Sequence, residues 1–454
     1  EMDDLASATS SKSTKLIHGG LRYLEYYEFM LVRKALNERE ILLKAAPHIV
    51  QPLKFILPHE AHLRPKWMIR LGLFLYDHLG KRERLPGSKQ IRLEGNDPDN
   101  PLYPRFTDGF TYYDCTVDDS RLVVLNALGA KDRGASILTR TKFISARNEG
   151  DHWRAKIVPG HEVTAKVIVN AAGPWVVDII NDGLSLPAQN RLRLVKGSHI
   201  IVPKLFDGKD AYILQNKDGR IIFAIPYRRD YTLIGTTDVP FEGDPTLVRI
   251  STEEIDYLCH HINAYFRKTL TPDDVISHYA GVRPLFDDAT EKASAVTRDY
   301  VLALREDGGA PLLSIFGGKI TTYRELAEEA LNKLSGHLPH MGVNWTAQAR
   351  LPGGAISDMD DFIQAQQRQY PNIEPALITR YAHRYGTRMD VMLKAWRKDA
   401  HLIGPGLYDY EATYLINQEW ATTPEDILWR RTKLGLTWSE DDVQSLEGWL
   451  KSHI

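Results

Sequence analysis

Two apolar strands that end in glycine turns constrain the fold of this chain most. The stretch "KVIVNAAGPW" (166–175) predicts a short buried strand that runs into a Gly-Pro turn. The stretch "PLLSIFGGKITTYRELAEEALNKLSG" (311–336) predicts a strand, a turn and then a helix. Buried strands that end in glycine turns before helices are typical of an α/β layer that binds a nucleotide. The sequence therefore predicts such a layer.

A second sheet is indicated by "RIIFAIPYRRDYTLIGTTD" (220–238), in which two β-rich runs flank a charged turn. This is the pattern of an antiparallel hairpin, and we expect it in a domain inserted into the α/β layer. Beyond about residue 350 the sequence becomes helical and polar, which indicates an appended helical domain. Other predicted elements are a helix over 14–46, a strand over 52–59, a glycine-closed helix over 117–135 and a strand over 136–147.

Composition excludes several classes of protein. The chain has 454 residues, of which 43% are hydrophobic and 26% charged, so wholesale disorder is excluded. A net charge of -2 gives no overall field for nucleic acid. Its two cysteines, Cys115 and Cys259, exclude a disulfide scaffold and leave no cysteine set for zinc or an iron–sulfur cluster. We expect no metal site, a reducing cytoplasmic compartment and, without a run of ~18 apolar residues, no membrane span.

The turn "FGGKITTYRE" is the first candidate site. Thr322 and Glu325 have the spacing of a capping box, so we expect a helix to begin there and to end at Gly336. Gly317 and Gly318 let a ligand approach the backbone, and the following helix N-terminus favours an anion or an electron-rich oxygen. The alternative is an ordinary strand-to-helix turn with an exposed lysine.

The stretch "SSKSTKLIHGGLRYLEYYEF" (10–29) is the second candidate. If it is helical, Lys15, His18 and Arg22 lie on one face. A neutral imidazole between fixed cations is a good general base for an alcohol, and the cations suit an anionic substrate. The alternative is a solvated basic face with a core histidine, although Gly19-Gly20 would give a structural helix no advantage.

Three further stretches carry candidates, each with a structural alternative. Arg283 in "HYAGVRPLFDD" and Arg298 in "AVTRDY" suit bidentate binding of phosphate, or are surface ion-pair partners. Ala172-Gly173 either brings backbone close to a cofactor or forms a plain turn. The basic aromatic segment 64–84 is typical of a helix that lies in a membrane surface, or it packs on its own domain.

Together these stretches resemble the FAD-dependent, quinone-linked glycerol-3-phosphate dehydrogenases along nearly the whole chain. The stretches that carry the resemblance are "SSKSTKLIHGGLRYLEYYEF", "HLRPKWMIRLGLFLYDHLGKR", "VNAAGPW", "LVKGSHIIVP", "IGTTDV", "YAGVRPL", "FGGKITTYRELAE" and "LWRRTKLGL". Each alone is moderately specific, and their order and number make the resemblance strong.

The resemblance implies an α/β fold: a Rossmann-type FAD-binding domain, an inserted antiparallel β-sheet substrate domain and a C-terminal all-α domain. The expected division is 1–50, 105–195 and 272–345 for the FAD-binding domain, 51–104 and 196–271 for the substrate or cap domain, and 350–454 for the helical domain.

The resemblance also implies a reaction and a set of site residues. The C2 hydroxyl of sn-glycerol 3-phosphate would be oxidised to the ketone of dihydroxyacetone phosphate, with hydride passing to N5 of FAD and electrons then to a membrane quinone. The implied catalytic residues are His18, Arg22 and Lys319, and the implied substrate-binding residues are Tyr23, Arg283, Arg298 and Lys319. The implied cofactor-binding residues are Glu1, Ser10, Ser11, Ser13, Thr14, Lys15, Ala172, Gly173, Gly317, Gly318 and Thr321.

The sequence departs from the family at its start. The family begins with a strand, a GxGxxG turn, a helix and a second strand that ends in an acidic residue. This chain contains no GxGxxG, begins at Glu1 rather than Met, and Glu1 matches the acidic residue. We therefore expect an N-terminally truncated FAD-binding domain, with roughly thirty residues of the usual unit absent.

Two other functions stay open. The first is an oxidase of the same family, which would pass electrons to O2 and make H2O2. The second is a flavin-free truncated protein that binds a membrane or a partner. For the dehydrogenase, the resemblance implies a cytoplasmic protein, peripheral on the inner face of the cell membrane through segment 64–84, with no nucleic acid partner and with a homodimer as an open alternative.

Overall fold

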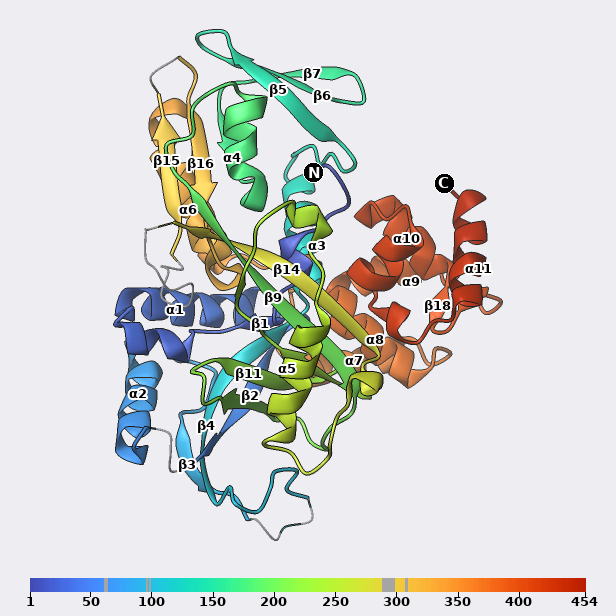
Figure 1. Cartoon of the computed structure of the whole chain (residues 1–454). Helices are drawn as coiled ribbons and strands as arrows, with labels where there is room; N and C mark the ends of the chain where they lie inside the picture. Colours follow the sequence, from blue (N-terminus) through green and yellow to red (C-terminus); the bar gives the residue numbers. More distant parts are fainter. Residues whose placement is uncertain (61–63, 95–96, 98, 288–298, 307–308) are drawn as a thin grey trace.

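A large mixed sheet organises the described part of the chain, which in this computed structural model is residues 1–454 without 61–63, 95–96, 98, 288–298 and 307–308 (Figure 1). The sheet has ten strands in the order β1-β4-β2-β10-β11-β12-β9-β13, with β3 paired to β4 and β14 paired to β9. Its strands are β1 (Leu16–Ile17), β2 (Val50–His59), β3 (Lys89–Arg92), β4 (Asp108–Val117), β9 (Leu192–Pro203), β10 (Ala211–Gln215), β11 (Ile221–Tyr227), β12 (Tyr231–Gly235), β13 (Val239–Pro240) and β14 (Ser277–Phe286).

The predicted hairpin is confirmed as β11 and β12, which pair antiparallel from Phe223–Gly235 to Tyr227–Tyr231. The predicted strand over 52–59 is also confirmed, within β2. Most pairs in this sheet are antiparallel, and β10 with β2 is a parallel pair. One face is covered by α5 (Thr252–Asn263), whose Leu258 and Ile262 are fully buried against strand residues such as Ile200.

A smaller sheet carries the two glycine turns. It has the order β15-β16-β8, made of β15 (Val301–Arg305), β16 (Leu312–Phe316) and β8 (Ile168–Asn170). Because β16 and β8 run parallel, with Leu312 opposite Ile168, their carboxyl ends meet at one edge. In α/β folds such an edge is where ligands bind. A separate antiparallel sheet, β5 (Lys142–Asn148), β6 (Trp153–Val158) and β7 (His161–Ala165), lies beside it (Figure 1).

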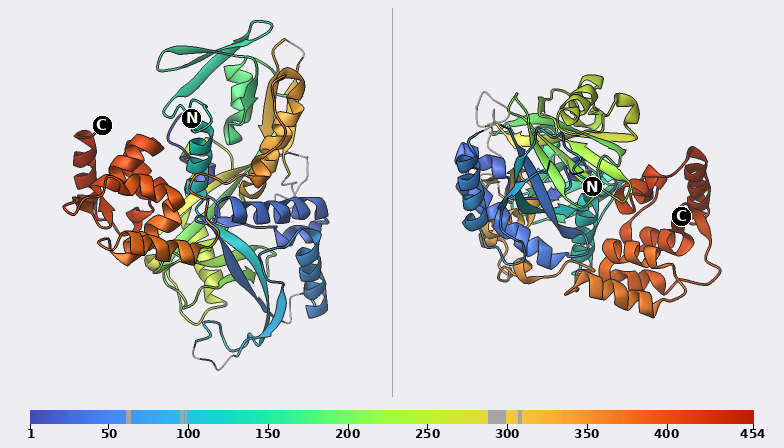
Figure 2. Two further views of the ribbon diagram at one scale, coloured as in Figure 1. Left: turned by 180° about the vertical axis from the view of Figure 1, so that it is seen from behind. Right: turned by 90° about the horizontal axis from the view of Figure 1, so that it is seen from below.

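Helices flank the sheets on opposite sides (Figures 1 and 2). On one side lie α1 (Phe29–Ala45) and α2 (Lys66–Leu79), and on the other lie the helices that follow residue 350, which have a core of their own. Those helices are α7 (Met359–Gln369), α8 (Pro375–Tyr385), α9 (Met389–Leu393), α10 (Asp409–Glu419) and α11 (Glu440–Lys451), with the small strand pair β17 (Leu402–Gly404) and β18 (Leu407–Tyr408) among them. The remaining α-helices are α3 (Asp119–Lys131), α4 (Val176–Asp178) and α6 (Tyr323–Lys333).

In the described residues, no helix combines the length and the apolar character that crossing a membrane requires.

The prediction of one helix over 14–46 is wrong in its first half. Residues 16–17 form β1, residues 21–26 form a 3₁₀ helix, and α1 begins only at Phe29. The reason is backbone conformation: Lys15 (φ 59°), Gly20 (φ 77°) and Tyr27 (φ 61°) are left-handed, which an α-helix does not tolerate. Apolar residues keep a helical spacing across these three positions, so the sequence pattern did not show that the helix is interrupted there.

Four other predictions need correction. The capping box at Thr322 does not form, because the Thr322 side chain makes no capping hydrogen bond, although α6 does begin directly after it. Helix α6 ends at Lys333 rather than at Gly336. The strand expected over 136–147 covers Lys142–Asn148, and the helix expected over 117–135 covers Asp119–Lys131.

The residue boundaries of the three expected domains stay a prediction. The sheet pairing bears on them in two places. Strands β4 and β14, placed by the sequence in the FAD-binding part, pair with β2 and β9 of the ten-stranded sheet. A division by sheet membership would therefore assign 108–117 and 277–286 to that sheet.

Candidate functional site

The candidate site is built on the two glycine turns at the carboxyl edge of β8 and β16. Gly173 (φ 57°) follows β8, and a Cβ placed there would meet no atom within 4 Å. Gly317 (φ 80°) and Gly318 (φ 113°) follow β16 and lead to α6. Left-handed glycines of this kind keep the backbone open to close approach by a ligand. The edge therefore offers the bare backbone that a flat, electron-rich ring requires.

The N-terminal loop meets this edge directly. The His18 amide donates to Thr321 Oγ1 at 3.3 Å, and the Lys319 ammonium lies 3.8 Å from the centroid of the Tyr23 ring. The structure thus brings four of the predicted site residues together, namely His18, Tyr23, Lys319 and Thr321. Arg22, on the same 3₁₀ helix as Tyr23, donates to the Tyr26 hydroxyl at 3.3 Å.

The double glycine has a structural reason. The Gly19 amide donates to the Tyr76 hydroxyl at 2.8 Å and to Asp114 Oδ1 at 3.3 Å. A Cβ on Gly19 would lie 2.7 Å from the Tyr76 hydroxyl oxygen, so only glycine fits. Tyr76 donates in turn to Asp114, which also forms a buried ion pair with Arg39 at 2.8 Å. The turn after His18 is therefore fixed by α2, β4 and α1.

Lys15 does not join His18 and Arg22, which corrects the expectation of a common face. Its side chain is buried, and Nζ lies 2.9 Å from both carboxylate oxygens of Asp119. Burial alone would lower the pKa of Lys15, but the Asp119 carboxylate raises it above its ordinary value. The Lys15 ammonium is therefore directed to Asp119 rather than to His18 and Arg22, and its role toward a cofactor stays a prediction.

The neighbouring polar residues are held by three different elements. Ser13 Oγ donates to Asp119 Oδ2 at 2.8 Å, and the Tyr279 hydroxyl donates to the Ser13 carbonyl at 2.8 Å. Thr14 Oγ1 lies 3.0 Å from Nε2 of His199. Residues 13–15 are therefore bound to α3, β14 and β9 at once.

Arg283 is oriented inside the ten-stranded sheet. Its guanidinium contacts Asp238 Oδ1 at 2.5 Å and donates to Thr236 Oγ1 at 2.7 Å. It also crosses directly over Gly197, where a Cβ would lie 2.2 Å from Nη2. Arg298, the other arginine predicted for the phosphate, lies outside the described residues.

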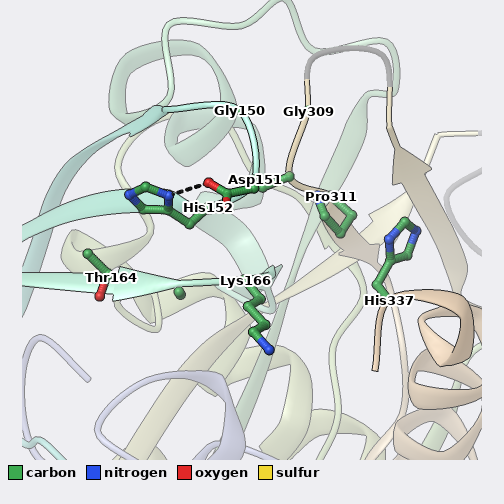
Figure 3. Close-up of a pocket in the computed structure, with 10 residues that line it drawn as sticks. Gly150, Asp151, His152, Thr164, Lys166, Gly309, Pro311 and His337 are labelled. Atoms are coloured by element: carbon green, nitrogen blue, oxygen red, sulfur yellow. Dashed lines mark hydrogen bonds and ion pairs between the residues drawn. The ribbon is translucent and has the colours of Figure 1, made fainter. Parts of the chain in front are cut away.

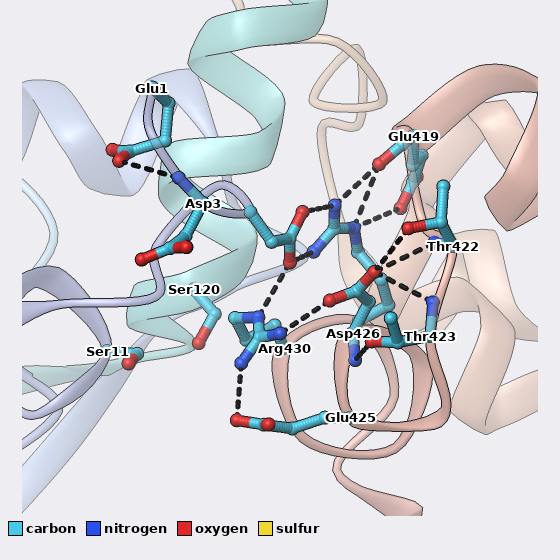
Figure 4. Close-up of polar contacts among 12 residues, drawn as sticks. Glu1, Asp3, Ser11, Ser120, Glu419, Thr422, Thr423, Glu425, Asp426 and Arg430 are labelled. Atoms are coloured by element: carbon cyan, nitrogen blue, oxygen red, sulfur yellow. Dashed lines mark hydrogen bonds and ion pairs between the residues drawn. The ribbon is translucent and has the colours of Figure 1, made fainter. Parts of the chain in front are cut away.

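The remaining predicted cofactor residues lie at the start of the chain. The Glu1 amino group donates to the Leu138 carbonyl at 2.9 Å, and the Glu1 carboxylate accepts from the Asp3 amide at 3.4 Å. Ser11 Oγ donates to the Ala8 carbonyl at 3.3 Å. Figure 4 shows how the C-terminal helices hold this segment. Asp4 is buried between Arg430, at 2.6 Å, and Arg431, at 2.7 Å. The roles of Glu1, Ser10, Ser11 and Ala172 toward a cofactor stay predictions.

Sequence reasoning assigned no role to two residues that shape this region, His199 and Asp119. His199 is fully buried, its ring stacks on Tyr279 at 4.8 Å, and burial with the nearby charges of Arg283 and Lys15 lowers its pKa well below 6.5. Asp119 accepts hydrogen bonds from Lys15 and Ser13. Asp118-Asp119 before a helical run is an N-terminal signal that could have been used, whereas His199 gave no signal beyond its place in an apolar strand.

A separate cavity of about 700 Å³ lies at the other edge of the small sheet (Figure 3). It is lined by residues at the amino ends of β8 and β16, including Lys166 and Pro311, together with His152 and His337. None of the predicted site residues lines it. Since the glycine turns lie at the carboxyl ends of the same strands, this cavity is not part of the candidate site.

Two family models account for most of the chain. The model described as FAD dependent oxidoreductase matches residues 1–324, and the model described as the C-terminal domain of alpha-glycerophosphate oxidase matches residues 344–450. The chain belongs to the FAD-dependent oxidoreductase family. The predicted fold class and the predicted cofactor are therefore confirmed, and the chain is a FAD-dependent enzyme.

Relatives of this FAD-dependent oxidoreductase include dehydrogenases named for phosphorylated polyols. A glycerol-3-phosphate dehydrogenase of Pseudomonas aeruginosa is 51% identical, over 100% of this chain and 90% of the relative. A D-erythritol 1-phosphate dehydrogenase of Brucella abortus is 49% identical, over 99% of this chain and 91% of the relative. The crystal structure of a glycerol-3-phosphate dehydrogenase from Bacillus halodurans, complexed with FAD, superposes with a TM-score of 0.72 at 27% identity, over 100% of this chain and 88% of that one.

The described residues fit the flavin part of FAD. The carboxyl edge carries three left-handed glycines, and the space beside Gly173 is open to a Cβ. Residues that would hold the flavin there are Gly173, Gly317, Gly318 and Thr321, with the N-terminus of α6 directed to the same edge. The sequence contains no GxGxxG turn, so a cradle of that kind for the pyrophosphate is not among its residues.

Proposed function

We propose that this enzyme oxidises the secondary alcohol of sn-glycerol 3-phosphate to the ketone of dihydroxyacetone phosphate. The observation that carries the proposal is the meeting of loop 18–23 with turn 317–321, where the His18 amide binds Thr321 and Lys319 lies over Tyr23. In this proposal His18 is the base, Lys319 the cation and Tyr23 the aromatic ring, at an edge suited to a flavin. The names of the relatives supply the substrate.

His18, Lys319 and Arg22 have different roles in the proposed reaction. FAD, when bound, supplies the acceptor for the hydride that leaves C2 of the alcohol. His18 takes the hydroxyl proton, and Lys319 stabilises the negative charge that grows on the oxygen. Arg22 adds a second positive charge on the same loop.

We propose Arg283 as the first of two arginines that bind the phosphate. Arg283 presents a fork already oriented by Asp238 and Thr236, which suits two oxygens of a phosphate. We propose Arg298 as the second phosphate ligand. Because a guanidinium shared with a carboxylate keeps its geometry before the substrate arrives, less entropy is lost on binding.

A second substrate has support from the relative in Brucella abortus, which is named for D-erythritol 1-phosphate. Its substrate differs from sn-glycerol 3-phosphate by one further CHOH unit, so both would offer a phosphate and a secondary alcohol. Purified enzyme should be assayed with both substrates under identical conditions, following flavin bleaching and the ketone product. A higher kcat/KM for sn-glycerol 3-phosphate supports the proposal, and a higher value for D-erythritol 1-phosphate replaces it.

Electrons would next pass to a quinone at the inner face of the cell membrane. An oxidase that reduces O2 to H2O2 remains the alternative acceptor reaction, because the model matching 344–450 is described for alpha-glycerophosphate oxidase. Turnover with a soluble quinone under argon, without peroxide in air, supports the quinone. Peroxide formed in equal amount to the ketone without any quinone supports the oxidase.

Peripheral attachment to the membrane would be provided by α2. Trp67, Leu71 and Phe74 on this helix are 66%, 50% and 50% exposed. We propose that Tyr27, just before α1, and Met30, in its first turn, belong to the same patch, since they are 80% and 64% exposed. Exposed aromatic and aliphatic side chains near Arg64 and other cations suit a helix at a lipid surface. We propose no nucleic acid partner, and a homodimer stays open.

A further inference from the structure

One lysine of the C-terminal part reaches the amino end of α3, to which the loop that carries the candidate site is bound. Lys433 follows the helical turn Asp426–Arg431 and has a left-handed backbone, with φ 58°. Its side chain is buried, and Nζ donates to Ser120 Oγ at 2.6 Å, at the amino end of α3. A left-handed backbone is costly for a long side chain, so the contact is made against a conformational preference.

Asp119, the residue before Ser120, is fully buried beside this contact. Lys433 Nζ lies 3.9 Å from Asp119 Oδ1, and Lys15 Nζ lies 2.9 Å from the same oxygen on the loop side. Lys15 is also left-handed, with φ 59°. Two lysines in strained backbone conformations thus flank one carboxylate, one from the C-terminal part and one from the site loop.

This arrangement is a poor way to gain stability. The pKa of Lys433 is lowered to about 7, mainly by burial; the charge of Asp118 opposes this effect and the charge of Lys15 adds to it. An apolar side chain of the same length would avoid the cost of burying an ammonium group. Residues that are kept in unfavourable conformations and environments often have a positioning role.

Asp119 is connected to His18 through the backbone of the loop 13–18. Ser13 and Lys15 are bound to its two oxygens, and the Lys15 carbonyl accepts a hydrogen bond from the amide of Val117. Three residues further on, the His18 amide is bound to Thr321. A shift of Asp119 would therefore move the backbone that leads to His18.

We propose that Lys433 is a positioning residue which, by holding the amino end of α3 at Ser120 and Asp119, fixes the site loop 13–18 for FAD and substrate. The inference rests on the proposed function for the meaning of the loop. The C-terminal part would then act on the reaction without touching the substrate.

The test compares two variants with a matched control in the full-length holoenzyme. Lys433→Met removes the ammonium group, and Ser120→Ala removes its nearest partner while keeping the lysine. Arg388→Met is the control, because Arg388 also joins the C-terminal part to α3, but at its other end, through Asp132 at 3.5 Å. Lys433→Arg keeps the charge and tests for rescue.

Amide hydrogen exchange and FAD affinity are measured for each protein. We expect the amides of Lys15, His18 and Gly19 to exchange at least fivefold faster in Lys433→Met, and the dissociation constant of FAD to rise at least fivefold. Ser120→Ala should show a smaller change of the same kind, Lys433→Arg a partial return, and Arg388→Met values within twofold of the wild type.

Two results would overturn the inference. One is unchanged loop exchange and unchanged FAD affinity in Lys433→Met. The other is faster exchange spread over the whole C-terminal part in both Lys433→Met and Arg388→Met, which would make Lys433 an ordinary docking contact. Failure of the proposed function is separate, since it is read from the wild type alone as an absence of FAD binding and of turnover with either phosphorylated polyol.

Discussion

The space that the Arg283 guanidinium occupies is left open by a residue that has no side chain. Gly197 on β9 lies opposite Gly281 of β14, two residues before Arg283, and the guanidinium crosses over its Cα. The first atoms that a Cβ on Gly197 would meet belong to the mobile end of the arginine rather than to backbone. A methyl group there would therefore displace the guanidinium while the sheet remains intact.

Gly197→Ala should accordingly raise KM for the phosphorylated substrate by about 10- to 100-fold, because losing one well-oriented charged hydrogen bond costs roughly 1.5–3 kcal/mol. The change in the thermal midpoint should be small. Steady-state kinetics and a melting curve measure both effects. Gly448→Ala is the control, since a Cβ there meets nothing within 4 Å. An unaltered KM in Gly197→Ala would remove Arg283 from the phosphate site.

His18 has a different signature from the phosphate ligands. Its backbone amide fixes its place on Thr321, so removing the imidazole leaves the loop contact intact. His18→Ala should lower kcat by roughly 10²- to 10⁴-fold with FAD still bound, as for loss of a general base. Stopped-flow reduction of the flavin measures this step directly. Reduction at the wild-type rate would transfer the base role to another group.

At the scale of single elements, strands were easier to predict than the loop that carries the proposed catalytic residues. The strands β2, β11, β12 and β16 follow from apolar runs bounded by turn residues. Residues 14–28 could not be predicted, because their path depends on distant partners: Gly19 is held by Tyr76 and Asp114, and Lys15 by Asp119. The helical period in this stretch was therefore misleading.

The same distinction applies to the site. The meeting of His18 with Thr321 and of Tyr23 with Lys319 agrees with the stretches on which the family resemblance was based. The ion pair between Lys15 and Asp119 could not be predicted, because a sequence does not show which lysine a buried carboxylate will contact. His199 was missed for the same reason, since its partner Thr14 is 185 residues away.

Helix α2 makes the clearest prediction at this scale. Replacing Trp67 and Phe74 together by serine should lower the fraction bound to anionic vesicles at least tenfold, because two large apolar side chains leave the lipid interface. Vesicle sedimentation measures the fraction. Only Leu73 and Tyr76 of this helix are buried, so the fold should persist.

The matched control is Leu247→Ser, at a residue that is 70% exposed on a different part of the surface. It should leave vesicle binding unchanged. Equal losses in the control and in the α2 variant would indicate a nonspecific effect of surface polarity, and undiminished binding of the α2 variant would assign the membrane contact to another surface.

At the scale of the whole molecule, buried ion pairs join the C-terminal helices to the rest. Arg431 binds Asp4, Arg121 binds Glu419 and Arg384 lies 3.4 Å from Asp118. Buried pairs of this kind contribute little net stability, yet removing one partner is costly because it leaves a charge unpaired. They therefore define how the parts fit together. Lys433 differs from Arg121, because burial lowers the pKa of Lys433 whereas Glu419 raises that of Arg121.

This difference gives a prediction of pH dependence. The pKa of Lys433 is lowered to about 7 in the folded protein from 10.5. Below pH 7 both the folded and the unfolded chain carry the proton, so the whole penalty of burying the charge applies. Between pH 7 and pH 10.5 the unfolded chain binds the proton and the folded one does not, so the stability of the wild type rises with pH.

Lys433→Met removes this penalty and with it the pH dependence that it causes. The free energy of unfolding of the variant, relative to wild type, should be higher at pH 6.5 than at pH 9.5 by about 1–3 kcal/mol. Urea titrations at the two pH values measure it, and groups that titrate equally in both proteins cancel. Lys451→Met, at an exposed lysine of α11, should show no such difference. A variant that is more stable at pH 6.5 and yet has a looser site loop would separate positioning from stability, whereas a loss of stability at both pH values would show that the Lys433 ammonium stabilises the fold.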